Sequence, residues 1–388
     1  MYFQDSSRPV NFDYKFHVLK PPHWTLRLSP SIVLSTHGRR SLVIGPLADI
    51  SNLLLTLLRD NLPRDLTWPF LLLTLVLAVT IWLFRSGHGS KDASGKERPA
   101  GLLEFLIPRD IYTHVSARVD ITLYVFERLL RPFWATAVIL SVGTFAETLV
   151  MNGLADTWGT GPALDISCVW MLLYSLVTLL LYDFIFYVIH YTEHKVPALW
   201  VIHKVHHSAE VLTPLTRYRE HFLEGPIYAA GAALAYGIAG GLFGWLFESD
   251  ITQATLFNIG FFSLLFGFNG SFRHYHVAFH YPVWLSKWLQ SPVMHHTHHS
   301  YLEKHWDTNL AAVTSIWDRL FRTLYIPEKD EYTPWGLGPE TQDQYRSFWQ
   351  NTAGPFKDWF AMLTGGSMRT SNPLTGGAAR TDVNERER

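Results

Sequence analysis

Histidine is concentrated in one part of the chain. Of the 19 histidines among 388 residues, 14 lie between positions 190 and 305. Eight of them form three groups with helical spacing, namely His190 and His194; His203, His206 and His207; and His295, His298 and His299. On a helix, residues three and four apart lie on one face with Cβ atoms about 5–6 Å apart. The spacing therefore predicts imidazoles that converge, as they do around a bound metal ion.

A fourth group, in the sequence FRHYHVAFH, adds His276 and His280, again four residues apart, and a third candidate, His274. Imidazole nitrogen is a suitable ligand for zinc, copper, iron and nickel. The four groups together offer eight to ten nitrogens, which is more than one ion takes. We therefore expect two metal ions.

Other motifs narrow the chemistry. The chain has neither Glu-x-x-His, which carries di-iron sites in helical bundles, nor the His-Glu-x-x-His of zinc proteases. Its one cysteine, Cys168, excludes an internal disulfide, a thiolate zinc cage and a four-cysteine iron–sulfur cluster. Ligation by imidazoles alone leaves both ions highly charged and open to O₂ or water. This favours oxygen activation over structural zinc, although spacing alone leaves the metal open.

The composition indicates which kind of protein must position these groups. The net charge is -1, so there is no basic excess with which to bind a nucleic-acid backbone. Charged residues make up 17% of the chain, against a usual quarter, and aromatic residues make up 15%. These values favour a membrane protein.

Long runs without charge support that interpretation, because a helix needs roughly 20 apolar residues to cross a bilayer. Four such runs are uncharged, and a fifth is interrupted only by Glu147; they are 66–84, 166–182, 226–247, 251–272 and, with Glu147, 132–155. We therefore predict an all-α, polytopic integral membrane protein with four or five transmembrane helices.

The charges of the connecting segments predict its orientation. Residues 85–131 contain eight Lys and Arg, and residues 183–225 contain four, whereas the loops 151–162 and 248–250 contain none. By the positive-inside rule the two basic segments face the cytosol. All the histidine groups then lie on that side, where we expect a histidine-rich helical cap.

The remaining segments divide the chain. Residues 1–65 are mixed in character, show no cleaved signal peptide and have no readable role. We expect one membrane domain over 66–330, with a Gly- and Ser-rich linker at 85–100. Residues 331–388 form a C-terminal tail, which we expect to be disordered from about 365 because it contains little to pack.

The order of the histidine motifs, HX3H, HX2HH and HX2HH, resembles that of the fatty acid hydroxylase/sterol desaturase superfamily of membrane di-iron enzymes. The surrounding sequences are also similar, from Tyr182-Asp183-Phe184 through LWVIHKVHHSAEVLTPLTRYREH to HYPVWLSKWLQSPVMHHTHHS and DTNLAAVTSIWDRLFRTLYIP. The resemblance covers about residues 130–330.

This resemblance implies an oxidoreductase that uses two iron ions, O₂ and external electrons to hydroxylate or desaturate a lipid-like substrate, or to cleave an ether lipid. Zinc is expected to replace iron in some purifications. The electron donor would be cytochrome b5, a ferredoxin or a reductase. The membrane would be the endoplasmic reticulum in a eukaryote or the inner membrane in a bacterium, with the histidines facing the cytosol.

Carried over to this chain, the resemblance assigns the metal ligands, eight of which are also the expected catalytic residues. These eight are His190, His194, His203, His206, His207, His295, His298 and His299. In the fourth group we favour His276 and His280 as further ligands, with His274 held in reserve.

Other polar residues are candidates for positioning these ligands. We expect Asp183, His221, His274, Asp307 and Asn309 to make hydrogen bonds around the site, with helix capping by Asp183 and pocket lining by His221 as alternatives. His296 and His305 either support ligands or face solvent. Glu193 is expected to point away from the site, and Asp318 to form an ion pair with Arg319.

Two other functions use the same residues. A di-zinc lipid hydrolase would need the same ligands without O₂. A metal-ion transporter would need polar groups distributed along the membrane normal, whereas here they gather at the ends of the spans, with Asp165 and Glu147 as the main exceptions. We favour the oxidoreductase.

Overall fold

The computed structural model describes residues 68–86, 101–247, 251–277, 279–329 and 331–365. Over these residues the chain is helical; there is no β-strand, and two isolated β-bridges join Leu289 to Thr314 and Ser300 to Trp335. This confirms the all-α class. The N-terminal region 1–65, most of the linker 85–100 and the tail beyond 365 lie outside the described residues.

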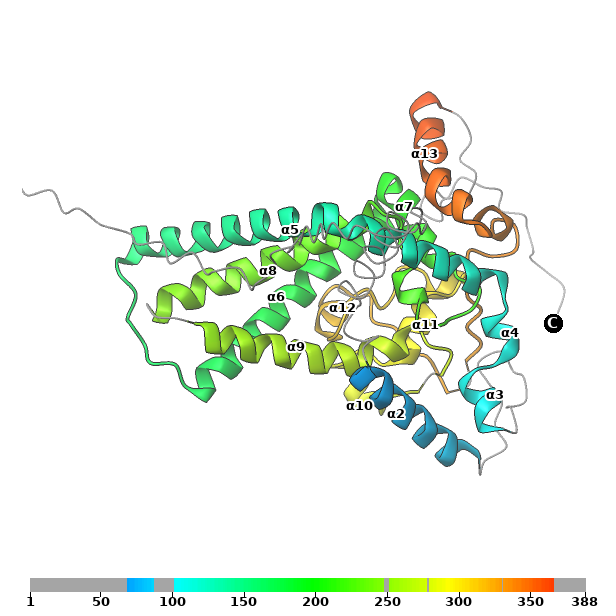
Figure 1. Cartoon of the computed structure of the whole chain (residues 1–388), viewed down its shortest axis with the longest axis horizontal. Helices are drawn as coiled ribbons and strands as arrows, with labels where there is room; N and C mark the ends of the chain where they lie inside the picture. The colour runs from blue at the N-terminus through cyan, green and yellow to red at the C-terminus, as the bar shows by residue number, and fades with distance from the viewer. Residues whose placement is uncertain (1–67, 87–100, 248–250, 278, 330, 366–388) are drawn as a thin grey trace, which may run out of the picture. The chain divides into compact units, whose positions relative to one another are not determined.

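Long helices form the body of the molecule and run alongside one another (Figure 1). They are α5 (Val115–Trp158), α6 (Cys168–Lys195), α8 (Glu224–Phe247) and α9 (Thr252–Arg273). Of these, α5, α6 and α8 are long and apolar enough to cross a membrane. The predicted runs 132–155, 166–182 and 226–247 lie in those three helices. Of the other two runs, residues 252–272 lie in α9 and residues 68–84 lie in α2 (Trp68–Ser86).

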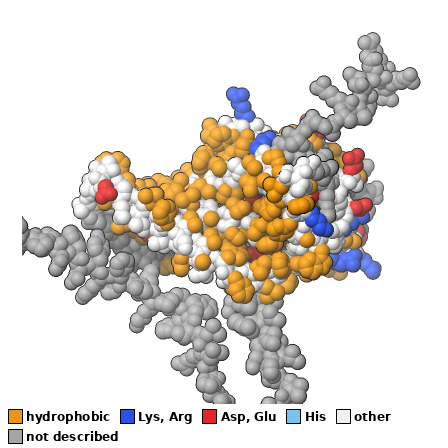
Figure 2. All heavy atoms as spheres, turned by 90° about the horizontal axis from the view of Figure 1, so that it is seen from above, with side chains coloured by type: hydrophobic (Ala, Val, Ile, Leu, Met, Phe, Trp, Pro, Cys, Tyr) orange, Lys and Arg blue, Asp and Glu red, His pale blue; other side chains and the backbone are white. Residues whose placement is uncertain are grey.

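The surface of the long helices is apolar. Phe133, Leu140 and Phe145 of α5 and Val169 of α6 are among the exposed large hydrophobic side chains. Figure 2 shows hydrophobic side chains over most of the face that it presents, with charged side chains mainly near its edges. Many of the buried residues, by contrast, are polar or charged. This distribution is the reverse of that in a water-soluble protein and is the one expected of a protein surrounded by lipid.

Small residues let α8 pack closely against α5. A Cβ atom added at Gly237 would lie 2.8 Å from the Cβ of Ala146, and one added at Gly241 would lie 2.9 Å from the Cβ of Val150. Real Cβ atoms do not approach so closely, so glycine is required at both positions. Close packing through small residues is typical of helix association in membranes, where burial of apolar surface gives no net drive.

Proline residues place the histidines at one end of these helices. Pro197 begins α7 (Pro197–His207), so α6 ends directly after His190 and His194. Pro292 begins α11 (Pro292–His298), whose first turn is capped by the Ser291 hydroxyl, 3.4 Å from the Met294 backbone nitrogen. Figure 1 shows α7 and α11 at the same end of the long helices.

The close approach of α8 and α5 gives the first prediction. We expect Gly237→Leu to lower the free energy of unfolding by about 1–3 kcal/mol, because the added side chain overlaps α5. Thermal unfolding of the detergent-solubilised protein measures the effect. Gly153→Leu on α5 is the control, since no atom lies within 4 Å of a Cβ at that position. Equal melting temperatures for the two variants would contradict the packing described.

Candidate metal centre

Nine buried histidines form two groups at the end of the long helices. The ligand nitrogens of each group all lie within 4.8 Å of one another. The first histidine group consists of His190, His194, His203, His207 and His298. The second histidine group consists of His206, His274, His295 and His299.

The two HX2HH motifs divide between the groups in a complementary way. In α7, His203 and His207 belong to the first group and His206 to the second; in α11 and its C-cap, His295 and His299 belong to the second group and His298 to the first. Residues four apart share a helix face, whereas neighbours are rotated by about 100°. Each motif therefore contributes to both groups, which brings the groups side by side. The His207 and His299 rings, one from each group, are stacked with centroids 4.8 Å apart.

The distances between nitrogens match those around a metal ion. Within the second group, the Nε2 atoms of His274, His295 and His299 are 2.8, 3.1 and 3.2 Å from one another. In the first group, His203 Nε2 lies 3.1 Å from the Nε2 atoms of His190 and His207. With metal–nitrogen bonds of about 2.1 Å, adjacent ligands are about 3.0 Å apart in an octahedron and about 3.4 Å apart in a tetrahedron.

Hydrogen bonds determine which ring nitrogen carries the proton in the first group. The Nδ1 atom of His190 lies 2.7 Å from the Leu310 carbonyl oxygen, and that of His298 lies 2.8 Å from the Thr308 carbonyl oxygen. Both carbonyls only accept, so Nδ1 donates and Nε2 keeps its lone pair. His194 Nε2 and His298 Nε2 are buried without a hydrogen-bond partner among the described residues. Unpartnered lone pairs facing a shared space are the donor set that a metal ion requires.

Carboxylates are the acceptors at Nδ1 for two other rings of the first group. His203 Nδ1 lies 2.6 Å from Glu224 Oε1, and His194 Nδ1 lies 3.2 Å from Asp307 Oδ1. A carboxylate behind the imidazole fixes the tautomer and makes Nε2 a stronger ligand. Asp307 thus lies where the sequence placed it, against a histidine of the site. Glu224 was not identified from the sequence; its position in the turn after His221 was the available signal.

The second group has a different environment. His206 Nδ1 is 3.3 Å from the Arg219 carbonyl oxygen, which makes it a donor. His295 Nδ1 instead faces the Arg273 guanidinium, 2.8 Å away. Guanidinium only donates, so Nδ1 of His295 accepts and its proton lies on Nε2. Arg273, at the last position of α9, is a second site residue that the sequence reasoning missed.

Burial keeps these imidazoles neutral. Loss of solvation is the largest cause that lowers the pKa of His206 to about 4, and it lowers the pKa values of His203, His207, His298 and His299 well below the ordinary value. Positive charge on neighbouring imidazoles would lower most of them further. Neutral imidazole is the form that binds metals, so the rings are ready to coordinate at neutral pH.

One irregular segment, residues 307–314, supplies the carbonyl acceptors. Five consecutive backbone N–H groups in it bind two buried carboxylates: those of Leu310 and Ala311 donate to Asp318, and those of Ala312, Val313 and Thr314 donate to Asp183. Asp183 therefore contacts this segment and not a histidine, which corrects its predicted role as a partner of a ligand. The two carboxylates hold the carbonyl oxygens in place for His190 and His298.

Asn309 also forms hydrogen bonds with backbone groups and not with a histidine ring. Its side-chain amide donates to the Met294 carbonyl oxygen at 3.0 Å, and its Oδ1 accepts the Tyr325 N–H at 2.9 Å. Asn309 is in the left-handed region, with φ of 56°, as is Asp307, with φ of 57°. Asn and Asp adopt this conformation more readily than other side chains do. Asn309 thereby joins the segment to the ligand helix α11.

In the fourth histidine group the structure differs from the prediction, which favoured His276 and His280 and held His274 in reserve. Helix α9 ends at Arg273, so the following residues do not share a helix face. His274, at the C-cap, lies in the second group. His276 is instead 2.8 Å from the Phe105 carbonyl oxygen, and His280 is exposed. Helical spacing was the wrong guide for a segment that is not a helix.

Two acidic residues also lie elsewhere than predicted. Glu193 does not point away; it is fully buried, accepts a hydrogen bond from the Tyr228 hydroxyl at 2.5 Å and lies 3.3 Å from His203 Nδ1. Asp318 does not pair with Arg319, whose guanidinium lies over the Trp288 ring at 4.4 Å. Asp318 instead accepts hydrogen bonds from the backbone N–H groups of Leu310 and Ala311.

Three further histidines, His221, His296 and His305, are buried but lie outside both groups. His221 Nε2 is 3.1 Å from the Thr352 carbonyl oxygen, and its backbone N–H donates to Glu224, which in turn binds His203. His296 Nε2 is 3.3 Å from the Phe272 carbonyl oxygen, and His305 Nε2 is 2.9 Å from Glu331 Oε1. His221 therefore acts on a ligand through one intermediate, and His296 and His305 are buried structural residues.

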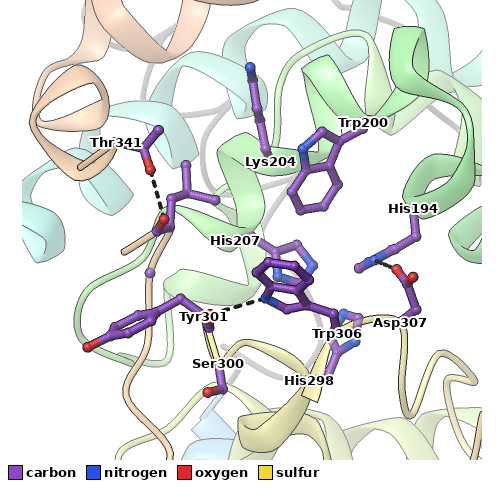
Figure 3. Close-up of a pocket in the computed structure, with 12 residues that line it drawn as sticks. His194, Trp200, Lys204, His207, His298, Ser300, Tyr301, Trp306, Asp307 and Thr341 are labelled. Carbon is purple, nitrogen blue, oxygen red and sulfur yellow. Dashed lines mark hydrogen bonds and ion pairs between the residues drawn. The ribbon is translucent and has the colours of Figure 1, made fainter. Parts of the chain in front are cut away.

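Two cavities open onto the groups. The larger, about 300 Å³, is lined by histidines of both groups and by residues of α5, α6, α8 and α9. The smaller, about 90 Å³, contains His194, His207 and His298 of the first group with Trp200 and Trp306 (Figure 3). The first group is therefore accessible from both cavities.

Paired groups of buried neutral imidazoles at one end of long apolar helices define a membrane protein with two histidine groups that could each bind a metal ion. Residues 175–323 match the fatty acid hydroxylase family. The chain is also similar to alkylglycerol monooxygenase from Xenopus tropicalis, with 26% identity over 168 residues. That match covers 40% of this chain and 31% of the relative, so the chain spans about a third of the relative's length. No solved structure matches the chain. Over residues 175–323 the chain is therefore similar to the fatty acid hydroxylase family.

The corrected position of the fourth group gives a prediction. We expect His274→Ala to lose about half of the bound metal, because it removes a nitrogen of the second group. His276→Ala is the matched control, two residues away and outside both groups, and should retain the parent metal content. Elemental analysis of the purified proteins measures both. Equal loss in the two variants would contradict the grouping.

Burial of neutral histidine also predicts sensitivity to acid. The pKa is about 4 for His206 and about 3 for His296 in the folded protein, against about 6.5 in an unfolded chain. Below pH 6.5 the unfolded chain therefore binds protons that the folded protein does not. Stability should fall as the pH is lowered from about 6.5 to 4, by up to about 1.4 kcal/mol per pH unit for each such histidine.

Thermal unfolding of the metal-free protein in detergent, between pH 7.5 and 5, tests this expectation. His296→Gln removes one titrating group and should make the pH dependence shallower. A melting temperature that stays constant over this range would show that the rings are not buried as neutral groups.

Proposed function

We propose that this protein is a membrane oxidoreductase that uses two iron ions and O₂ to oxidise a lipid. The observation that carries the proposal is the pair of adjacent imidazole groups lining one cavity among the long helices. The candidate ligands are the nine histidines of the two groups. An enzyme of this kind needs a site in which metal, oxygen and an apolar substrate meet away from bulk water.

Bound iron would supply the activation of O₂ that is needed to break an unactivated C–H bond. The chain's own residues have separate tasks. The carboxylates of Glu224 and Asp307 and the carbonyls of segment 307–314 orient the imidazoles. Arg273, beside His295, adds a fixed positive charge that stabilises negative charge developing at the centre.

The larger cavity fits an amphiphilic substrate. One part of its wall is charged and contains Arg128, Arg131, Arg217 and Glu220. Another part is formed by apolar and small residues, namely Trp134, Phe186, Ala229 and Ala232. A polar headgroup would lie against the charged part, while the hydrocarbon portion lies along α8 and presents a carbon to the histidine groups. Holding that carbon in register is the main contribution of the protein to rate and selectivity.

The substrate class follows from this cavity and from the relative. The name of the similar protein, alkylglycerol monooxygenase, makes glycerol ethers the first lipids to test, followed by fatty acyl lipids, sphingoid bases and sterols. We further propose that the histidine groups face the cytosol and that electrons come from a partner such as cytochrome b5, a ferredoxin or a reductase.

The test is oxidation of these lipids by the iron-loaded protein in nanodiscs, with a chemical reductant and either O₂ or nitrogen. We expect an oxidised lipid and consumption of O₂ only when iron, reductant and O₂ are all present. Turnover with zinc alone and without O₂ would show a hydrolase instead. No O₂ consumption with any lipid class would end the proposal.

The cavity supplies the matched variants for the same assay. Ala232→Trp should lower turnover at least tenfold while metal content is unchanged, because the larger side chain fills the apolar part of the cavity. Leu234→Trp, two residues away on the exposed face of α8, should retain activity. If both variants are equally active, the substrate binds elsewhere.

A further inference from the structure

Helix α13 (Phe348–Thr364) buries polar side chains and exposes large apolar ones. Its buried residues include Asn351, Thr352 and Asp358, all polar. Its exposed residues include Trp349 and Phe360, which are 74% and 68% exposed, and Leu363, which is 86% exposed. A helix on a water-soluble surface has the opposite arrangement, with its apolar stripe facing the core.

Specific polar contacts hold the helix in this orientation. Asp358 forms a buried ion pair with Lys204 of α7 at 2.7 Å. Asn351 accepts from the Ser208 hydroxyl at 3.3 Å, and the Thr352 carbonyl lies 3.1 Å from His221 Nε2. Turning the apolar face inward would leave these groups buried without partners or break the ion pair, which is costly. The apolar face is therefore fixed outward.

The position of α13 along the axis of the long helices indicates the surroundings of its exposed apolar face. The Phe348 ring packs against that of Phe126 of α5, with centroids 5.1 Å apart. Phe126 lies six residues, or about 9 Å along the helix axis, before Pro132, where the charge-free run begins. A headgroup layer is about 5–8 Å thick on each side of a bilayer, and a helix is about 10 Å across. Helix α13 thus lies beside the headgroup layer, and its second half runs across the direction of the long helices (Figure 1).

The composition of the exposed face is that of a helix at a membrane surface. Trp349, Phe356, Phe360 and Leu363 are all exposed, and the exposed charge among them is basic, at Lys357. The acidic residue of α13, Asp358, is buried. Large apolar side chains with a flanking basic residue are typical of helices that lie in the interface between headgroups and acyl chains.

We propose that α13 lies in the interface of the same membrane, on the side of the histidine groups, with Trp349, Phe356, Phe360 and Leu363 inserted among phospholipids. Its inner face contacts α7, which carries His203, His206 and His207. Contact with lipid therefore steadies the helix that contributes to both histidine groups. The proposal stands apart from the oxidase activity and holds for any function of the metal centre.

Spin labels measure the depth of this face. The labelled sites are Phe360→Cys and Leu363→Cys, each in a Cys168→Ser background, in the full chain reconstituted into nanodiscs of phosphatidylcholine and phosphatidylglycerol. Asp343→Cys is the control, because its side chain is exposed outside α13. Power saturation with O₂, which concentrates in lipid, and with a water-soluble nickel chelate reports the surroundings of each label. Metal content equal to that of the parent shows that each labelled protein is folded.

We expect labels at positions 360 and 363 to be at least threefold more accessible to O₂ than to the nickel chelate, relative to position 343. Accessibility like that of position 343 would overturn the proposal and leave a soluble protein partner as the occupant of this face. Low accessibility to both reagents would also overturn it and would indicate a contact with a second copy of the chain.

Discussion

The site depends on the direction of the protons on its buried imidazoles. An imidazole presents a lone pair towards the shared space when its other nitrogen donates to a fixed acceptor. For His190 and His298 the acceptors are carbonyls of segment 307–314, and for His203 the acceptor is Glu224. His295 has the opposite tautomer, because its Nδ1 faces the Arg273 guanidinium. The architecture around the centre can be understood as the means of holding these acceptors still.

That requirement explains the polar interior. Asp183 and Asp318 are buried at the expense of their solvation, and both are compensated by backbone N–H groups of the segment that they hold. Arg219 is buried against Asp120 at 2.9 Å and also donates to Ser208, which fastens α7 to α5. Buried charges are tolerated when they are paired and hydrogen-bonded. The outer surface of the long helices is apolar in turn, so the molecule is polar within and hydrophobic outside.

The same inversion of polarity relates the histidine groups to their surroundings. The larger cavity joins both histidine groups to the long helices, from which an apolar molecule can approach, and the smaller one opens beside Trp200 and Trp306. Helix α13 has the same inverted polarity, with a buried ion pair on its inner face and exposed aromatic residues on its outer face.

The amino-acid sequence by itself determined what depends on local geometry. Charge-free runs produce helices of the right length, and the spacing of His203, His206 and His207 places their rings on defined sides of one helix. Tertiary structure alone decided which distant groups meet. His274 and not His276 or His280 joins the second group, because α9 ends at Arg273. Asp183 and Asp318 both bind the backbone of segment 307–314, which lies more than a hundred residues after Asp183. These contacts depend on which donors and acceptors are buried together in the folded chain. The spacing of residues along the chain does not determine this.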